Sequence, residues 1–120
     1  MKYYLAGPMR GLPDSNYGAF AEARERLRRS GYDVHCPAEG ATEPATDDSY
    51  APQMAGCLDA VLKSDALIVL PGWGKSEGAK VEVAVAVATG KPVFAYHRHR
   101  PHPVEELGGL RIVTRAEMLK

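Results

Sequence analysis

Short apolar runs alternate along the chain with longer segments in which apolar residues recur every three to four positions. The runs predict β-strands and the longer segments predict α-helices. Strands are expected at residues 2–6, 32–36, 65–70, 92–96 and 110–113. Helices are expected at about residues 17–30, 50–64 and 78–89, with a short one at the C-terminus. This alternation predicts an α/β fold, a doubly wound, flavodoxin- or Rossmann-like parallel sheet of four to five strands with helices on both faces.

The first two predicted helices each have one apolar face. Its positions are Phe20, Ala23 and Leu27 in the first helix and Met54, Leu58, Val61 and Leu62 in the second. Gly31 ends the first helix, as glycine commonly does. Between the second strand and the second helix, residues 37–49 are rich in Pro, Thr, Gly and Asp. A loop of this length in a small domain indicates function, and we expect it to overhang a site.

The third predicted helix is apolar around nearly its whole circumference. From Val81 to Thr89 it reads V-E-V-A-V-A-V-A-T, with Glu82 as the only charged residue. The alternating valines would also suit a β-segment, but the length and the small alanines favour a closely packed helix. A sheet covers only one side of such a helix, so we expect the other side to pack on a second copy of the chain. A homodimer through residues 78–89 is the predicted assembly.

Composition narrows the possible partners. The chain has 120 residues, of which 45% are hydrophobic and 25% charged, which suits one domain over residues 1–120. Fifteen basic residues balance fifteen acidic ones, so we expect a small-molecule partner rather than a nucleic acid polymer or a membrane. There is no membrane-length apolar run or signal-peptide pattern, and a cytoplasmic location is expected. Cys36 and Cys57 fit neither a zinc site nor a disulfide framework. No metal or other cofactor is expected.

Ligands of parallel sheets bind beyond the carboxyl ends of the strands, where three loops of this chain meet. The loop after the first strand carries G-P-M-R-G, in which Arg10 is a cation suited to phosphate. The loop after the third strand carries G-W-G-K-S-E-G directly before a helix, where Ser76 and free N–H groups could hold an anion. A tight turn that only reverses the chain is the simpler explanation of either loop by itself.

Glu82 is the most specific candidate. Burying a carboxylate in an apolar helix costs on the order of several kcal/mol unless it is hydrogen-bonded or lies in a cleft. The spacing leaves two explanations open, a catalytic carboxylate and one that caps its own helix or a neighbouring loop. Further acidic candidates are Glu39, Asp59 and Asp65, of which Asp65 could equally be a structural cap at a strand entrance. Trp73 could stack on a base or close the end of the sheet.

Three histidines, His97, His99 and His102, occur in the segment H-R-H-R-P-H. No carboxylate or cysteine accompanies them within the predicted loop, so a solvated basic turn is favoured over a metal site. The arginines of this segment could instead reach a phosphate across the predicted dimer.

Four motifs taken together are specific. They are Y-L-A-G-P-M-R-G, N-Y-G-A-F, C-P-A-E and L-P-G-W-G-K-S-E-G-A-K-V-E followed by A-x-x-x-G-K-P. Over most of its length the chain resembles the nucleoside 2-deoxyribosyltransferase superfamily, which includes the 2'-deoxynucleoside 5'-phosphate N-hydrolases. The nearest likeness is to a branch from phages and bacteria.

The resemblance implies roles for individual residues. Glu82 would attack the anomeric carbon of the sugar and form a covalent glycosyl-enzyme, and Tyr4 would orient it. Arg10 and Ser76 would hold a 5'-phosphate, which favours a nucleoside monophosphate over a free nucleoside. The further predicted binding residues are Gly7, Pro8, Gly11, Trp73 and Gly78.

The chain departs from the family pattern at one position. The family has an aspartate eight residues before the aspartate that opens the third strand, and this chain has Cys57 there. Asp59 is the nearest acidic residue along the chain and is retained as a catalytic candidate. On a helix it lies about 200° away from position 57, so it could replace the missing aspartate only after a register shift.

Hydrolysis of the N-glycosidic bond of a nucleoside 5'-monophosphate is therefore the predicted activity. One alternative is a nucleotide-binding or sensing module that has lost its chemistry at position 57. A second is deoxyribosyl transfer between bases, which needs an acceptor base and a pocket that excludes water. A third is a lysine-decarboxylase-like phosphoribohydrolase, which expects a fuller glycine-rich motif than this chain has.

Overall fold

The computed structural model describes residues 1–9, 12–37 and 47–107. Its strands are β1 (Lys2–Ala6), β2 (Asp33–His35), β3 (Ala66–Val69), β4 (Val93–Tyr96) and β5 (Val104–Glu106). Its helices are α1 (Tyr17–Arg29), α2 (Asp47–Lys63) and α3 (Glu77–Ala88), with 3-10 turns η1 (Pro13–Asn16) and η2 (Trp73–Lys75). The first four predicted strands and the three long predicted helices are confirmed. The expected terminal helix lies outside the described residues.

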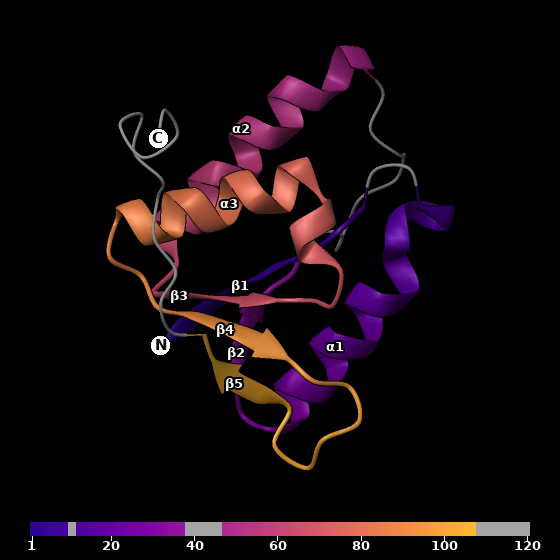
Figure 1. The fold of residues 1–120 in the computed structure, drawn as a ribbon, viewed down its shortest axis with the longest axis vertical. Helices are drawn as coiled ribbons and strands as arrows, with labels where there is room; N and C mark the ends of the chain where they lie inside the picture. The colour runs from indigo at the N-terminus through magenta and orange to yellow at the C-terminus, as the bar shows by residue number, and fades with distance from the viewer. Residues whose placement is uncertain (10–11, 38–46, 108–120) are drawn as a thin grey trace, which may run out of the picture.

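The strands form one sheet in the order β2-β1-β3-β4-β5 (Figure 1). β1 lies between β2 and β3, and the pairs β1–β2, β1–β3 and β3–β4 are all parallel. The chain therefore winds outward from β1 in both directions, which is the predicted doubly wound arrangement. The ends of β1 and β3 lie at the centre of the carboxyl edge of the sheet.

The fifth strand differs from the prediction. The strand expected at residues 110–113 lies outside the described residues, whereas β5 at Val104–Glu106 was not predicted. It pairs antiparallel with β4, opposite Phe94, Ala95 and Tyr96. A parallel neighbour needs a crossover connection, but the polar loop at residues 97–103 is too short for one and returns the chain alongside β4. The sheet is therefore mixed, with an antiparallel strand at one edge.

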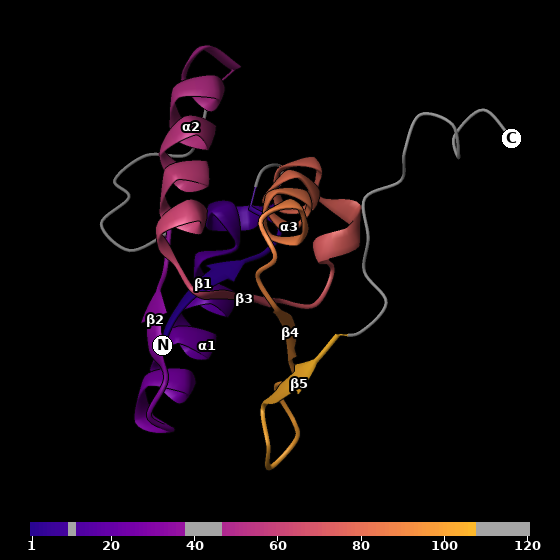
Figure 2. The same cartoon turned by 90° about the vertical axis from the view of Figure 1, so that its left-hand side faces the viewer.

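The two faces of the sheet have separate apolar cores, because successive side chains of a strand point to opposite faces. Tyr4 and Ala6 of β1 pack with residues of α2 and α3, whereas Leu5 packs with residues of α1. Figures 1 and 2 show α2 and α3 together on one side of the sheet and α1 on the other. Tyr4 is therefore directed to the face that carries α3 and its single buried carboxylate.

Helix α2 corrects two expectations. It begins at Asp47, three residues before the expected start at Tyr50. Leu62, predicted to lie on the apolar face, has 52% of its surface exposed. Val61 is buried and Cys57, one helical turn before it, is half-buried against the same core, whereas Leu62 lies about 100° around the helix from Val61.

Helix α3 is buried on one side and open on another. Ala79, Glu82, Val83 and Ala86 are buried. The sheet and α2 cover this side, whereas Val81, Ala84 and Ala88 form an exposed stripe and Val81 is 42% exposed. The prediction that the sheet cannot cover all of this apolar helix is confirmed. Neither α3 nor any other helix within the described ranges is long and apolar enough to cross a lipid bilayer.

Candidate functional site

Glu82 and Tyr4 form a buried pair beneath the N-terminal half of α3. Tyr4 is completely buried, and only 6% of the surface of Glu82 is exposed. The Tyr4 hydroxyl donates a hydrogen bond to Oε2 of Glu82. The two residues are 78 positions apart in the sequence and meet because β1 and α3 pack on the same face of the sheet. The charged residue that stood out in the sequence thus has a specific hydrogen-bond partner.

Burial sets the protonation of this pair. Desolvation raises the pKa of the Glu82 carboxyl to about 7, although the hydrogen bond from Tyr4 acts in the opposite direction. Desolvation, together with the nearby charge of Glu82, raises the pKa of the Tyr4 hydroxyl well above its usual value. Tyr4 therefore remains a hydrogen-bond donor over the physiological range. Glu82 changes charge near neutral pH, which is a common property of carboxylates that perform chemistry.

Cys57 is the third member of the cluster. Its half-buried thiol, on α2, lies close enough to the Tyr4 hydroxyl for the two groups to influence each other's pKa. Burial raises the pKa of the Cys57 thiol, although the Tyr4 hydroxyl acts in the opposite direction. The position at which the chain departs from the family pattern therefore lies in contact with the residue predicted to orient the nucleophile.

Asp59 does not join this cluster. Its carboxylate pairs with Lys63, with 2.8 Å between Oδ2 and Nζ, and 61% of its side chain is exposed. The reason is geometric, since two positions along a helix correspond to a rotation of about 200°. With Cys57 facing the core, Asp59 faces solvent, and no register shift brings it to Glu82.

The loop after β1 is shaped by a close approach of two strand ends. A Cβ atom on Gly7 would lie 2.9 Å from Cβ of Leu70, so only glycine fits at this point. The carbonyl of Pro8 accepts a hydrogen bond of 2.9 Å from Nδ2 of Asn16, which fixes the loop against the start of α1. Arg10 and Gly11 lie outside the described residues, so their predicted role stays a prediction.

The loop after β3 has structural contacts at each predicted position. The Ser76 hydroxyl caps α3 by accepting a hydrogen bond of 3.2 Å from the backbone N–H of Ala79. Trp73 is half-buried and packs against the apolar core on the α2 and α3 side. Gly78 lies in the first turn of α3. These contacts account for the shape of the loop, and the proposed ligand contacts of the three residues remain predictions.

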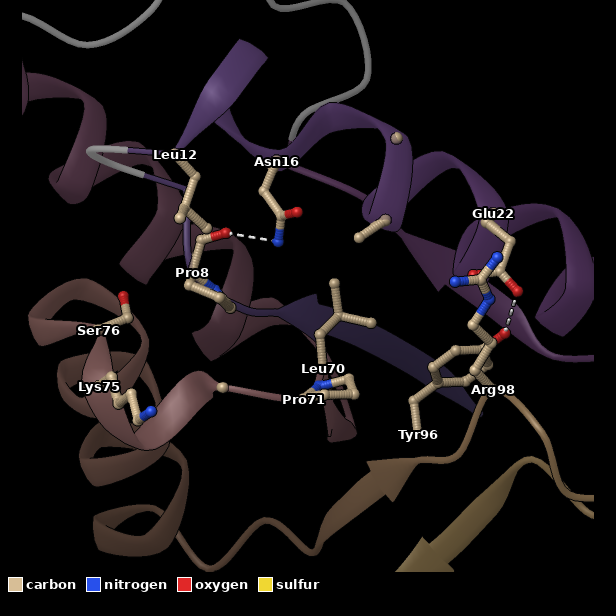
Figure 3. A pocket seen from close by; sticks show the side chains of 13 residues that line it. Pro8, Leu12, Asn16, Glu22, Leu70, Pro71, Lys75, Ser76, Tyr96 and Arg98 are labelled. Carbon is tan, nitrogen blue, oxygen red and sulfur yellow. Dashed lines mark hydrogen bonds and ion pairs between the residues drawn. The ribbon is translucent and has the colours of Figure 1, made fainter.

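A cavity of about 600 Å³ lies at the carboxyl edge of the sheet, on the α1 side (Figure 3). Its walls include Pro8 and Ser76 from the predicted site, but neither Tyr4 nor Glu82 is among its lining residues. Figure 3 shows Lys75 and Ser76 at one end and Glu22, Tyr96 and Arg98 at the other. The cavity and the Glu82 cluster thus lie on opposite faces of the sheet.

Arg26 was missed by the sequence analysis because it has the same pattern as the other arginines on the polar side of α1. Its guanidinium donates hydrogen bonds to the backbone carbonyls of His97, Arg98 and Arg100 and lies 5.9 Å from the centre of the Tyr96 ring. It therefore holds the loop between β4 and β5. In the part of the chain that the structure describes, no three His, Cys, Asp or Glu side chains are arranged to bind a metal ion.

Comparison with solved structures identifies the fold. A 2-deoxyribosyltransferase from Bacillus psychrosaccharolyticus matches with a TM-score of 0.62 and 21% identity, over 80% of this chain and 72% of that one. A 2-deoxyribosyltransferase from Leishmania mexicana matches with a TM-score of 0.59 and 18% identity, over 91% and 80% of the two chains. A conserved protein from Enterococcus faecalis V583 matches with a TM-score of 0.57 and 30% identity, over 82% and 65%.

No curated protein sequence matches the chain. The sequence profile described as "Domain of unknown function (DUF4406)" matches residues 1–95. The resemblance inferred from the motifs is confirmed by the shared fold. The chain therefore belongs to the DUF4406 family and has the nucleoside 2-deoxyribosyltransferase-like fold.

Proposed function

We propose that this protein hydrolyses the N-glycosidic bond of a nucleoside 5'-monophosphate, with Glu82 as the nucleophile. The observation that carries the proposal is the hydrogen bond from Tyr4 to a carboxylate that is 6% exposed and has a pKa of about 7. A structural carboxylate is usually neutralised by a cation or by several backbone N–H groups. The Tyr4 hydroxyl only partly offsets the desolvation, which leaves Glu82 reactive rather than deeply stabilised.

The proposed reaction has two displacements at the anomeric carbon of the sugar. An oxygen of Glu82 forms a bond to C1', and the bond from C1' to the base nitrogen breaks with its electron pair leaving on the base. The base takes up a proton as it departs. Water then attacks C1', the ester bond to Glu82 breaks, and the free sugar phosphate and the carboxylate are released.

Tyr4 supports the first displacement by position rather than by proton transfer. Its hydroxyl occupies Oε2 of Glu82, so Oε1 is the oxygen that is free to attack. Burial keeps Tyr4 protonated, and its rigid aromatic ring on the interior strand β1 fixes the carboxylate plane. Such an oriented nucleophile needs little rearrangement before attack.

The phosphate is proposed to bind at the start of α3. Ser76 precedes Glu82 by six residues, which is about 9 Å along a helix axis and comparable to the length of a pentose with its 5'-phosphate. The N-terminal turn of α3 contributes positive dipole and unpaired N–H groups at this end. Arg10, predicted from the resemblance, would add a cation from the loop after β1.

Cys57 indicates that turnover is slow. A thiol is a much weaker acid than a carboxylic acid, and burial weakens it further, so it protonates a departing base poorly. Loss of a general acid typically lowers a rate by about 10²- to 10⁴-fold. Cys57 is therefore also the observation that favours the second candidate function, a nucleotide-binding module without turnover.

The assembly is proposed to be a homodimer through α3. Its exposed stripe of Val81, Ala84 and Ala88 presents small apolar side chains on one side of the helix. Two such stripes can approach closely across a two-fold axis. This contact would bring the active sites of the two copies near each other.

One assay separates the candidate functions. The wild-type protein and Glu82→Gln are incubated with deoxy- and ribonucleoside 5'-monophosphates, and base release is followed by chromatography. Glu77→Gln is the matched control, because Glu77 lies on the same helix but is exposed and pairs with Lys80. Hydrolysis predicts release by the wild-type and control proteins and none by Glu82→Gln. Binding without release supports the binding module, and a new nucleotide formed only when a free acceptor base is added supports base exchange.

A further inference from the structure

The cavity on the α1 side is larger than the proposed monophosphate requires. In the proposed function, the sugar lies at Glu82 on the α2 and α3 side of the sheet, and the phosphate lies at Ser76. Ser76 and Pro8 form part of the cavity wall, whereas Glu82 and Tyr4 do not. A monophosphate bound in this way would occupy only the Ser76 end of the cavity and leave most of its roughly 600 Å³ empty.

Positive charge lines this space. Lys75, next to Ser76, is exposed at the cavity, and within the described ranges its ammonium has no ion pair. At the far end, Arg98 lies with Nε 3.4 Å from Oε2 of Glu22. Two cations and one carboxylate leave the cavity with a net charge of +1 from these side chains. A ligand that extends into it should therefore carry negative charge.

The far end of the cavity is held in place before any ligand arrives. Glu22 accepts a hydrogen bond of 3.1 Å from the Tyr96 hydroxyl, so its carboxylate has a fixed position. Arg26 binds the backbone carbonyl of Arg98 and that of its neighbour His97. A preformed site loses less conformational freedom on binding than a mobile one.

Small side chains keep the space open between its two ends. Gly18 and Ala19 of α1 line one wall, and Leu70 and Pro71 line another. Larger residues at either α1 position would project into the cavity. The cavity therefore has an apolar middle section between polar ends, which is a common feature of small-molecule sites.

We propose that this cavity receives a second phosphate joined to the 5'-phosphate, so that the preferred ligands are nucleoside 5'-diphosphates and their conjugates rather than monophosphates. The inference rests on the proposed function for the position of the first phosphate. The chemistry at Glu82 is unchanged, because the added group lies on the opposite face of the sheet from the anomeric carbon. Lys75 contacts the second phosphate, and Arg98 contacts the group beyond it.

The test is calorimetric binding of the four common deoxynucleoside 5'-monophosphates and of the matching 5'-diphosphates to Glu82→Gln, which cannot consume them. For the base that binds, we expect the diphosphate to bind about tenfold more tightly, as one added charge-assisted contact would give. A second substitution in the Glu82→Gln protein, either Lys75→Ala or the cavity-filling Ala19→Leu, should remove most of the difference in affinity between diphosphate and monophosphate. Lys63→Ala and Ala55→Leu, exposed positions on α2, should preserve it.

Several results would overturn the inference. They are equal binding of the two nucleotide classes, no binding of either, equal weakening of both by Ala19→Leu, and two ligands bound per chain. Thermal unfolding of each variant checks that it is folded. If the diphosphate preference holds while the wild-type protein releases no base, the proposed hydrolysis fails and the ligand assignment stands. If base is released but the diphosphate preference is absent, the ligand assignment fails and the proposed hydrolysis stands.

Discussion

The hydroxyl of Tyr4 on β1 donates a hydrogen bond to the carboxylate of Glu82 on α3, and the thiol of Cys57 on α2 lies beside the same hydroxyl. Three elements thus meet at one phenolic oxygen. This oxygen links the proposed nucleophile to the position at which the family pattern is broken. Each member of the set makes a separate prediction.

Replacing Tyr4 with Phe removes the hydrogen bond to Glu82 and keeps the aromatic ring. Because that bond lowers the pKa of Glu82, its loss should move the pKa above its present value of about 7. Hydrolysis needs the ionised carboxylate, so the acidic limb of the pH–rate profile should shift to higher pH. At neutral pH the rate should fall about 10- to 100-fold, as expected for loss of a hydrogen bond to a charged group. An unshifted profile would show that Tyr4 does not control Glu82.

The buried carboxyl also makes folding stability depend on pH. The pKa of Glu82 is about 7 in the folded protein, against an ordinary value of 4.5. The folded state therefore binds the proton more tightly, and this contribution to stability is full below pH 4.5 and is lost as the pH rises through 7. The loss should be on the order of 2–4 kcal/mol.

Urea unfolding at pH 5 and pH 8 measures this term. Glu82→Gln cannot ionise, so its free energy of unfolding should decline less between the two pH values than that of the wild-type protein. Glu77→Gln, at an exposed position, should behave like the wild type. An identical decline in all three proteins would mean that Glu82 is not desolvated.

Cys57→Asp introduces a carboxylic acid at the position where the nucleoside 2-deoxyribosyltransferase superfamily has an aspartate. It should accelerate base release by about tenfold or more, because a carboxylic acid protonates the leaving base better than a thiol does. Asp59→Asn is the comparison, and it should leave the rate unchanged since Asp59 is exposed and paired with Lys63. A slower Cys57→Asp enzyme, or a large loss in Asp59→Asn, would contradict this assignment.

The exposed stripe on α3 predicts the assembly. Val81→Glu places a charge at the N-terminal end of this stripe and should convert the dimer to a monomer, as measured by size-exclusion chromatography with light scattering. Leu62→Glu is a matched substitution, since Leu62 is also an exposed apolar residue, on α2. A monomeric wild-type protein would refute the dimer, and dissociation by Leu62→Glu alone would move the interface to α2.

The central part of the fold could be predicted because it depends on local periodicity. The apolar run of β1 and the unusual composition of α3 are visible in the sequence, and a doubly wound sheet packs both together. The meeting of Tyr4 with Glu82 followed only through the family resemblance, since 78 residues separate them. Strand β5 was missed because V-E-E has no apolar run, and its pairing depends on the path of the preceding loop.

The site was predicted less completely than the fold. Helical geometry already placed Asp59 about 200° from Cys57, and the ion pair with Lys63 shows where that rotation directs it. The cavity walls could not be foreseen, because Glu22, Tyr96 and Arg98 come from three elements that only tertiary packing brings together. Arg26 has the sequence context of a solvated arginine, although it holds backbone carbonyls.

The most direct test of Glu82 as the nucleophile is to find where the sugar becomes attached. The protein is incubated with 5'-monophosphates of 2'-fluoroarabinosyl nucleosides, in which fluorine slows breakdown of a glycosyl-enzyme, and its peptides are mapped by mass spectrometry. We expect a fluorinated sugar phosphate on the peptide that contains Glu82, attached to that residue and absent from Glu82→Gln. Attachment to another residue, or base release that continues unchanged in Glu82→Gln, would contradict it.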